Sequence, residues 1–350
     1  MSYKQTRVWI VDKNKEIDKN VECIKEAGLW IKNNEVVALP TETVYGLGAN
    51  ARSNKAVAKI FEAKGRPSDN PLIVHIAKIE QLNKIVKEIP ETARKLMEAF
   101  WPGPLTIIFQ NAGQVAEKVT AGLPTVAIRM PDHPVALALL EAADVPVAAP
   151  SANLSGKPSP TTAQHVLADL NGRIAGIVDG GPTGVGLEST VIDCTVHPPM
   201  IYRPGGVTKE EIEAVIGEVC LDQALVGGSE VPKSPGLKYT HYAPEGDLVL
   251  VEDVHIIQAL VNEEKKKGKK VGVLTTEERK GRYEADVVLT CGRRQKLATV
   301  ATQLYSVLRQ FDATNVDVIF SETFPKEGVG EAVMNRLEKA AGGRVIRRDA

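Results

Sequence analysis

The fold is decided around residues 39–48, which read Leu39-Pro40-Thr41-Glu42-Thr43-Val44-Tyr45-Gly46-Leu47-Gly48. An apolar run at 36–39 leads into them and predicts a buried strand. The hydroxyl and carboxylate side chains offer hydrogen-bonding groups, and Gly46 and Gly48 permit positive φ and a close backbone approach to a ligand. Because open α/β sheets bind ligands at the carboxyl ends of their strands, the stretch predicts a binding loop. An ordinary strand–turn–helix connection is the alternative.

Length and composition indicate a two-domain globular protein. The chain has 350 residues, of which 43% are hydrophobic and 25% charged, values typical of soluble proteins with their own cores. The formal net charge is −1. A chain that works mainly by holding RNA phosphates usually carries a basic excess, so this balance argues against that class, although a local basic cleft remains compatible with it.

Cysteine usage and hydropathy predict a cytoplasmic protein. The four cysteines, Cys23, Cys194, Cys220 and Cys291, are scattered and form no C-x-x-C pair, which argues against structural zinc and a disulfide framework. No run reaches the roughly 18 to 20 apolar residues of a membrane span, and the N-terminus lacks a signal-peptide pattern.

Hydrophobic periodicity predicts α/β organisation in both halves. In the first half it predicts helices at 16–33, 54–63 (with Asn54 as N-cap) and 91–100, and strands at 105–109 and 125–131. In the second half, strands at 247–251, 270–274, 285–289 and 316–320 alternate with helices at 256–266, 297–311 and 330–341. This alternation predicts a small parallel, Rossmann-like domain.

Basic residues stand at the ends of several predicted elements. Lys64 and Arg66 flank Gly65 after a helix, where they suit either a phosphate clamp or the negative end of the helix dipole. Arg129 lies in an apolar strand and needs an anionic partner, from the protein or from a ligand. Arg203 ends another strand. His75, alone in a strand, is more often structural.

No metal cage or nucleophilic constellation is legible. The glycine-rich run 180–190 lacks the Gly-Lys-Ser/Thr of a P-loop, and a strand follows it where a dinucleotide fingerprint would open a helix. The residues therefore predict binding and positioning of an anionic, phosphate-rich substrate, without attack by a side chain.

Six motifs, in order, resemble the YrdC-type threonylcarbamoyl-AMP synthase family. They are residues 40–47 (PTETVYGL), 64–67 (KGRP), 70–72 (NPL), 101–106 (WPGPLT), 129–131 (RMP) and 151–153 (SAN). With Glu188-Ser189-Thr190-Val191 and Arg203-Pro204-Gly205, the resemblance covers about residues 10–217. Residues 234–236 and 241–244 resemble the linker of the long, two-domain form, and the last hundred or so residues resemble its accessory domain.

The resemblance implies a fold and a reaction. We expect a YrdC-like twisted open mixed sheet with helices at 1–218, a linker or lid at 219–245, and an accessory Rossmann-like domain at 246–350. The reaction joins L-threonine, bicarbonate and ATP into threonylcarbamoyl-AMP and pyrophosphate, with Mg²⁺ on the phosphates. The product enters threonylcarbamoyladenosine modification of tRNA beside the anticodon, through a separate transferase complex.

The resemblance also implies site residues. Lys64 and Arg66 would be catalytic, and no protein side chain is assigned as a metal ligand. Threonine would be held by Thr43, His75, Arg129, Ala149 and Ser189, with Arg129 meeting the carboxylate. ATP would be held by Arg66, Asn70, Thr125, Ser151, Asn153, Ser159, Arg203 and Tyr242.

Two other functions and one structural question stay open at this stage. The chain could be a double-stranded RNA or tRNA-binding module without catalysis, with direct tRNA binding expected to be weak. It could also be a carbamoyl-transfer domain of the hydrogenase-maturation type, against which the lack of zinc-finger cysteines and acylphosphatase sequence argues. Residues 234–244, rich in Tyr, His and Lys between Pro-Gly turns, are predicted to close as a lid over the nucleotide or, alternatively, to dock the two domains.

Overall fold

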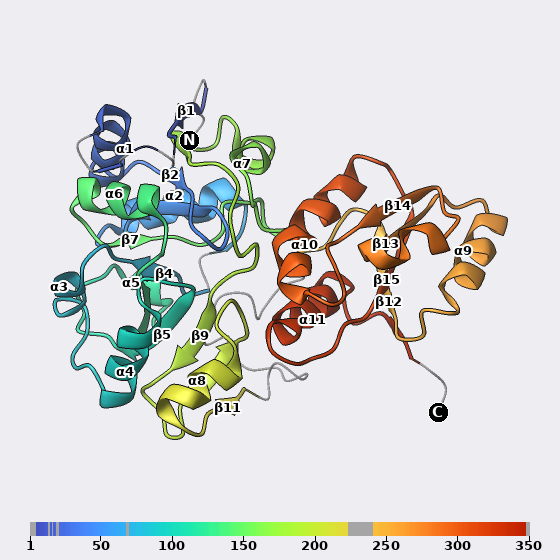
Figure 1. Cartoon of the computed structure of the whole chain (residues 1–350). Coiled ribbons are helices and arrows are strands. Elements are labelled where there is room, and N and C mark those ends of the chain that lie inside the picture. The colour runs from blue at the N-terminus through green and yellow to red at the C-terminus, as the bar shows by residue number, and fades with distance from the viewer. Residues whose placement is uncertain are drawn as a thin grey trace. The chain divides into compact units, whose positions relative to one another are not determined.

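The computed structural model describes residues 5–12, 15, 17–18, 21–67, 70–222 and 241–347 (Figure 1). These residues form two compact units. The first unit contains the described residues up to 155, together with 159–184 and 188–222, and the second contains 156–158, 185–187 and 241–347. Most of the predicted linker, and residues 234–240 of the predicted lid, lie outside the described residues. The lid and the domain boundaries therefore stay predictions.

The first unit is built on a mixed sheet. Its described strands number eleven, in the order β1-β8-β2-β3-β7-β4-β6-β5-β9-β10-β11. The strands are β1 (Arg7–Ile10), β2 (Val37–Leu39), β3 (Gly46–Asn50), β4 (Ile73–His75), β5 (Leu105–Gln110), β6 (Thr125–Arg129), β7 (Val147–Ala148), β8 (Gly176–Asp179), β9 (Thr190–Asp193), β10 (Met200–Arg203) and β11 (Cys220–Leu221). The helices are α1 (Glu22–Lys32), α2 (Asn54–Lys64), α3 (Ile79–Leu82), α4 (Glu91–Phe100), α5 (Glu117–Thr120), α6 (Pro134–Ala143), α7 (Ala163–Leu170) and α8 (Lys209–Ile216).

The opening stretch turns back on itself between β2 and β3. The two strands are antiparallel, with Leu39 opposite Gly46 and Val37 opposite Gly48. Neither glycine has a positive φ, so the left-handed conformation that glycine permits is not used at these positions. A Cβ on Gly48 would lie 2.9 Å from a Leu39 methyl and 3.0 Å from Val147, whereas close approach of this backbone to a ligand stays a prediction. Gly48 lets neighbouring strands pack, and the polar residues 41–43 occupy the connection.

Three expectations about local structure need correction. Helix α1 begins at Glu22, whereas the sequence predicted position 16. The N-cap of α2 is Ser53, whose side chain accepts from the Ala56 N–H. Strand β6 ends at Arg129, whereas the sequence predicted position 131.

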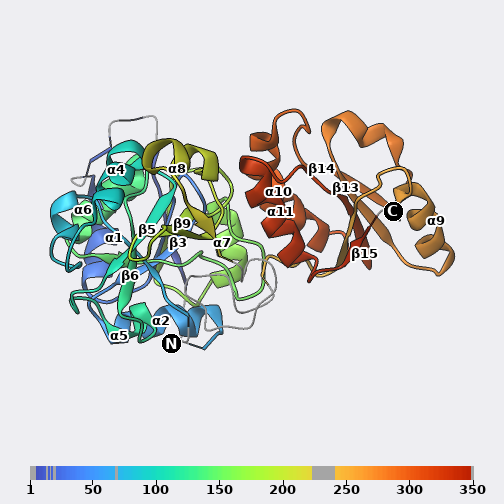
Figure 2. The ribbon, with the colours of Figure 1, turned by 90° about the horizontal axis from the view of Figure 1, so that it is seen from below.

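The second unit is a three-layer α/β domain. Its described strands form a five-stranded sheet in the order β14-β13-β15-β12-β16, and every pairing is parallel. Figure 2 shows α10 and α11 together on one face of this sheet and α9 on the other. The elements are β12 (Asp247–Val251), α9 (Ile257–Lys266), β13 (Val271–Thr275), η2 (Glu277–Arg282), β14 (Val287–Thr290), α10 (Leu297–Asp312), β15 (Val318–Glu322), α11 (Val329–Ala340) and β16 (Val345–Ile346).

The predicted fold class is confirmed. A large mixed sheet with helices and a smaller parallel α/β unit are both present. Within the described ranges, no helix has the length and apolar character that a membrane crossing requires.

Candidate functional site

The predicted threonine residues gather where strands of the first unit end. His75 and Arg129 are the last residues of β4 and β6, and they are register partners across this parallel pair. Ala149 follows β7, and its N–H donates to the Ile73 carbonyl at the opposite side of β4. The register of three adjacent strands thus brings these residues, distant in sequence, to one place.

Arg129 contacts a protein group through each of its three side-chain nitrogens. Its Nη1 donates to Thr43 Oγ1 at 2.8 Å, its Nε donates to the Gly103 carbonyl at 3.2 Å, and its Nη2 lies 2.5 Å from Glu42 Oε1. The sequence left the anionic partner of Arg129 undecided, and in this structure it is Glu42. Both side chains are largely buried, and a buried charge is stable only when it is paired, so each of the two residues needs the other.

Thr43 is fixed by its neighbour as well as by Arg129. Thr41 Oγ1 donates to the Val44 carbonyl at 2.6 Å and accepts from the Thr43 and Val44 N–H groups. The Thr41 and Thr43 hydroxyl oxygens are 2.9 Å apart. These bonds give the 41–44 turn one conformation, which presents Thr43 to Arg129.

His75 is a neutral imidazole in this environment. Burial, and secondly the charge of Arg129, lower the pKa of His75 to about 3. Its Nδ1 lies 3.3 Å from the Ile73 carbonyl. A neutral ring can donate a hydrogen bond from one nitrogen and accept at the other, which suits a hydroxyl or amine ligand.

Ser189 is held by Arg203 and by Thr106, a residue that sequence reasoning missed. Arg203 donates from Nε to the Ser189 carbonyl at 3.0 Å and from Nη2 to Ser189 Oγ at 3.1 Å. The hydroxyl oxygens of Thr106 and Ser189 are 2.7 Å apart. All three are buried. Thr106 ends a quoted motif, but nothing in the sequence showed that β5 would pair with β9 and place it here.

Lys64 makes hydrogen bonds to two of the residues that are predicted to bind ATP. Its Nζ donates to the Ser151 carbonyl at 2.5 Å and to the Asn153 carbonyl at 2.7 Å, with Asn153 Oδ1 at 3.4 Å. Gly65, at φ +64°, ends the helix immediately after it. In this conformation the ammonium shapes the 151–153 loop.

Ser159 pairs with Glu188, which the sequence analysis placed in a motif but did not predict as a site residue. Ser159 Oγ donates to Glu188 Oε1 at 2.5 Å, and both side chains are buried. Because Glu188 precedes Ser189, this bond connects a predicted nucleotide residue with a predicted threonine residue.

Within the described part of the chain, neither Asn70 nor Thr125 makes a side-chain hydrogen bond to another predicted site residue. The Arg66 guanidinium lies 5.5 Å from the centroid of the Phe61 ring. Thr125 begins β6 opposite Gln110. Asn70 is fully buried, and its amide nitrogen and oxygen have no hydrogen-bond partner within the described part of the chain. A buried, unpaired amide is costly, which is consistent with a polar ligand at this position.

Comparison with known proteins decides the family. Residues 30–205 match the Sua5–YciO–YrdC family, described as "Telomere recombination", and residues 207–342 match "Threonylcarbamoyl-AMP synthase, C-terminal domain". The chain belongs to this family. The resemblance inferred from the motifs is thereby confirmed.

Two relatives of this family member align along nearly its whole length, and a third aligns with about half of it. Threonylcarbamoyl-AMP synthase of Bacillus subtilis (strain 168) is 59% identical over 345 residues, 98% of this chain and 100% of that protein. The crystal structure of Pyrococcus abyssi Sua5 complexed with L-threonine superposes with a TM-score of 0.93, at 48% identity, covering 98% of this chain and 100% of that one. Threonylcarbamoyl-AMP synthase of Vibrio cholerae (strain O395) is 36% identical and covers 47% of this chain and 88% of its own length.

Tyr242, the remaining predicted residue of this Sua5–YciO–YrdC chain, lies in the second unit. Its ring stacks on Tyr305 with centroids 5.2 Å apart, and the Arg336 guanidinium lies 5.7 Å from its centroid. The side chain is 4% exposed. Its predicted contact with ATP stays a prediction.

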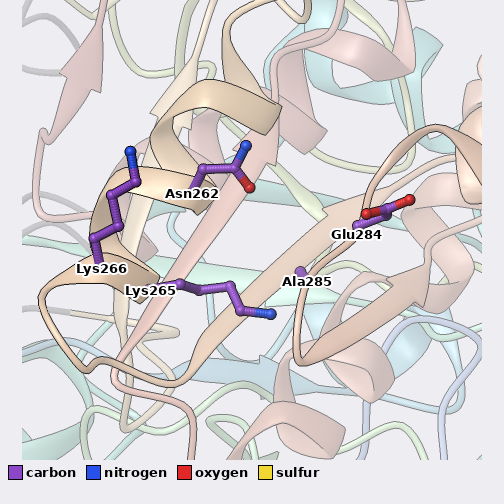
Figure 3. Close-up of a pocket in the computed structure, with 5 residues that line it drawn as sticks. All are labelled: Asn262, Lys265, Lys266, Glu284 and Ala285. Atoms are coloured by element: carbon purple, nitrogen blue, oxygen red, sulfur yellow. The ribbon is translucent and has the colours of Figure 1, made fainter.

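The second unit also has a hollow of about 670 Å³ beside α9 (Figure 3). It is lined by Asn262, Lys265, Lys266, Glu284 and Ala285, none of which was predicted as a site residue. Lys265 pairs with Asp286 at 3.3 Å, and Lys266 is exposed. Among the described residues of both units, no group of three His, Cys, Asp or Glu side chains is arranged to hold a metal ion.

Proposed function

We propose that this protein is a threonylcarbamoyl-AMP synthase, which forms threonylcarbamoyl-AMP and pyrophosphate from L-threonine, bicarbonate and ATP. The observation that carries this conclusion is the 59% identity to the Bacillus subtilis enzyme of that name over 98% of this chain and all of that one. Enzymatic function is therefore favoured over a binding module without catalysis. A solved relative that holds L-threonine supports the amino-acid substrate.

Threonine is proposed to bind among Thr43, His75, Arg129, Ala149 and Ser189. The planar guanidinium of Arg129 suits a carboxylate, and Glu42 already occupies its Nη2. The carboxylate of threonine must therefore share or replace that contact. Neutral His75 and the paired hydroxyls of Ser189 and Thr106 can recognise the threonine hydroxyl without an added charge.

ATP is proposed to bind along Arg66, Asn70, Thr125, Ser151, Asn153, Ser159, Arg203 and Tyr242. Arg66 and Arg203 supply cations, and Lys64 supports the 151–153 loop through its three acceptors there. Magnesium is proposed to accompany ATP, held largely by phosphate oxygens, with the Glu188 carboxylate as a fitting hard oxygen donor within this set. The ion would neutralise phosphate charge.

The chemistry needs positioning more than a protein nucleophile. The threonine nitrogen bonds to the carbon of bicarbonate, from which water is lost, to give a carbamate. A carbamate oxygen then forms a bond to the α-phosphorus while the bond from that phosphorus to the bridging oxygen breaks. Pyrophosphate leaves with the electron pair of that bond. Alignment of the carbamate and stabilisation of phosphate charge by Arg66 and Arg203 are the contributions expected of the chain.

The decisive experiment measures pyrophosphate from purified protein with ATP, bicarbonate, Mg²⁺ and one amino acid at a time. Threonine should support release, serine should do so more weakly, and valine hardly at all, because a site built for a hydroxyl rejects the isostere that lacks it. Equal release with valine would show that the threonine site is wrongly assigned, and no release with any amino acid would contradict the proposed function. We place the reaction in the cytoplasm, upstream of a transferase complex that carries the product to tRNA.

A further inference from the structure

The second unit contains a topological switch point that the proposed reaction does not use. Strands β13 and β15 are neighbours. After β13 the chain continues to β14, at one edge of the sheet. After β15 it continues to β16, at the opposite edge. In doubly wound sheets, ligands bind at the carboxyl ends of the two strands where the connections diverge in this way. Threonylcarbamoyl-AMP synthase of Vibrio cholerae matches 47% of this chain with 88% of its own length, so that relative does without more than half of this chain.

A buried carboxylate sits at this point between two arginines. Thr275 and Glu322 are the last residues of β13 and β15, and the Thr275 hydroxyl donates to Glu322 Oε1. Glu322 is fully buried. Its Oε2 accepts from Arg279 Nη1 at 2.6 Å and from Arg294 Nη1 at 3.2 Å. Since a buried carboxylate is stable only when paired, both guanidinium groups are held at the strand ends.

The loops that carry these arginines are tied together by backbone bonds. The Cys291 N–H donates to the Thr275 carbonyl at 2.8 Å, and the Glu277 N–H donates to the Gly292 carbonyl at 2.9 Å. Gly292 has φ +60°, and a Cβ there would lie 2.5 to 2.6 Å from backbone atoms of Thr299 and Val300, in the first turn of α10. The loop after β14 is thus packed closely against both η2 and α10, which fixes the backbone position of Arg294.

Arg294 is fixed at its far end as well. Its Nη1 also donates to the Thr323 carbonyl at 2.9 Å, and its guanidinium lies 5.5 Å from the centroid of the Phe324 ring. The side chains of Arg279 and Arg294 remain 21% and 33% exposed. Each guanidinium has five N–H donors, and within the described residues both use only Nη1 in hydrogen bonds. The remaining donors can face a ligand.

The charge at the switch point is positive. Residues 276–282 and 292–296, with Glu322, contain six lysines and arginines against three carboxylates. Two of these carboxylates serve the loops: Glu277 pairs with Arg293 at 2.8 Å, and Glu278 accepts from the Arg294 N–H at 3.1 Å. Glu322 holds Arg279 and Arg294 in place among these cations, and guanidinium groups are the donors best matched to phosphate oxygens.

We propose that the switch point between β13 and β15 binds a small phosphate-bearing ligand, anchored by Arg279 and Arg294. Glu322 acts as the internal counter-ion that positions both arginines, and its two oxygens are already occupied by Thr275 and the arginines. The site is separate from the residues proposed for threonylcarbamoyl-AMP synthesis. The ligand is either inorganic phosphate or a nucleotide that binds through its phosphate.

The test is hydrogen exchange of the full-length protein, titrated in parallel with inorganic phosphate, AMP and a short RNA duplex. Phosphate or AMP should slow amide exchange in 276–282 and 292–296, and the arm with higher affinity identifies the source of the phosphate. Arg294→Lys keeps a charge beside Glu322 but loses the planar fork, so its affinity should fall at least tenfold. Lys266→Gln, an exposed position on α9, is the matched control and should bind as the unaltered protein does.

Three results would overturn the proposal: no slowing in these segments with phosphate or AMP, slowing only with RNA, or equal affinity in the Arg294→Lys variant. Pyrophosphate release is followed in the same samples. Arg294→Lys should retain it, which separates a failure of this proposal from a failure of the proposed synthase activity. Arg279→Gln serves as a second variant and should also lose at least tenfold in affinity, once thermal unfolding shows that it folds.

Discussion

His75, a residue of the candidate threonine site, should make the stability of the protein depend on pH. The pKa of His75 is lowered to about 3, chiefly by burial, whereas an unfolded histidine titrates near about 6.5. Between these values the unfolded chain binds a proton that the folded chain does not. The free energy of unfolding should therefore decrease as pH falls below about 6.5, by up to about 1.4 kcal/mol per pH unit from this residue.

Urea unfolding of the unaltered protein and of His75→Gln at pH 7, 6 and 5 checks this expectation. The variant should lose less stability between pH 6 and 5, because its side chain does not titrate. Above pH 7 the two proteins should have parallel profiles. Identical slopes below pH 6 would mean that His75 gains a proton while folded.

Arg66 tests the nucleotide half of the site. Its removal should weaken ATP binding by about 1.5 to 3 kcal/mol, the range for hydrogen bonds to a charged group. Calorimetry on Arg66→Ala measures this loss, and Arg52→Ala, exposed beside the start of α2, is the control. Thermal unfolding must accompany it because Arg66 also contacts Phe61. Unchanged ATP affinity in a folded variant would remove Arg66 from the site.

At the scale of elements, Gly205 controls the segment that carries Ser189. A Cβ at Gly205 would lie 2.3 Å from the Thr190 nitrogen and 2.4 Å from the Glu188 carbonyl oxygen. Gly205→Ala should displace this segment, destabilise the protein by about 1 to 3 kcal/mol and weaken threonine binding at least tenfold. A Cβ at Gly184 would lie 4.0 Å from the nearest heavy atom, the Glu42 carbonyl oxygen, so Gly184→Ala should bind threonine normally. Calorimetric titration with threonine compares the two variants, and equal affinities would contradict this account.

The same scale shows what the sequence could and could not predict. Helix α4 has the predicted bounds because its apolar spacing and its flanking prolines agree. Helix α1 starts late because Ile17 and Val21 continue the helical spacing while packing on the core without being helical. Periodicity reports burial, and it indicates a helix only where the backbone agrees. The pairing of Arg129 with Glu42 and of Thr106 with Ser189 depends on strand register, which local patterns do not contain.

At the scale of the whole molecule, the net charge limits the affinity of the protein for tRNA. The net charge of −1 provides little non-specific attraction to a polyanion, so tRNA should bind with a Kd no tighter than about 10⁻⁶ M at physiological salt. Synthesis of threonylcarbamoyl-AMP uses only small molecules, so pyrophosphate release should proceed at the same rate with and without tRNA.

Filter binding across a salt series, with pyrophosphate release measured in parallel, tests both expectations. A steep salt dependence together with nanomolar affinity would reveal a concentrated basic surface that the net charge conceals. Pyrophosphate release that required tRNA would mean that binding of the nucleic acid completes the active site. Either result would restore the RNA-binding function that the sequence left open, whereas weak binding with tRNA-independent release leaves the chain as a small-molecule synthase.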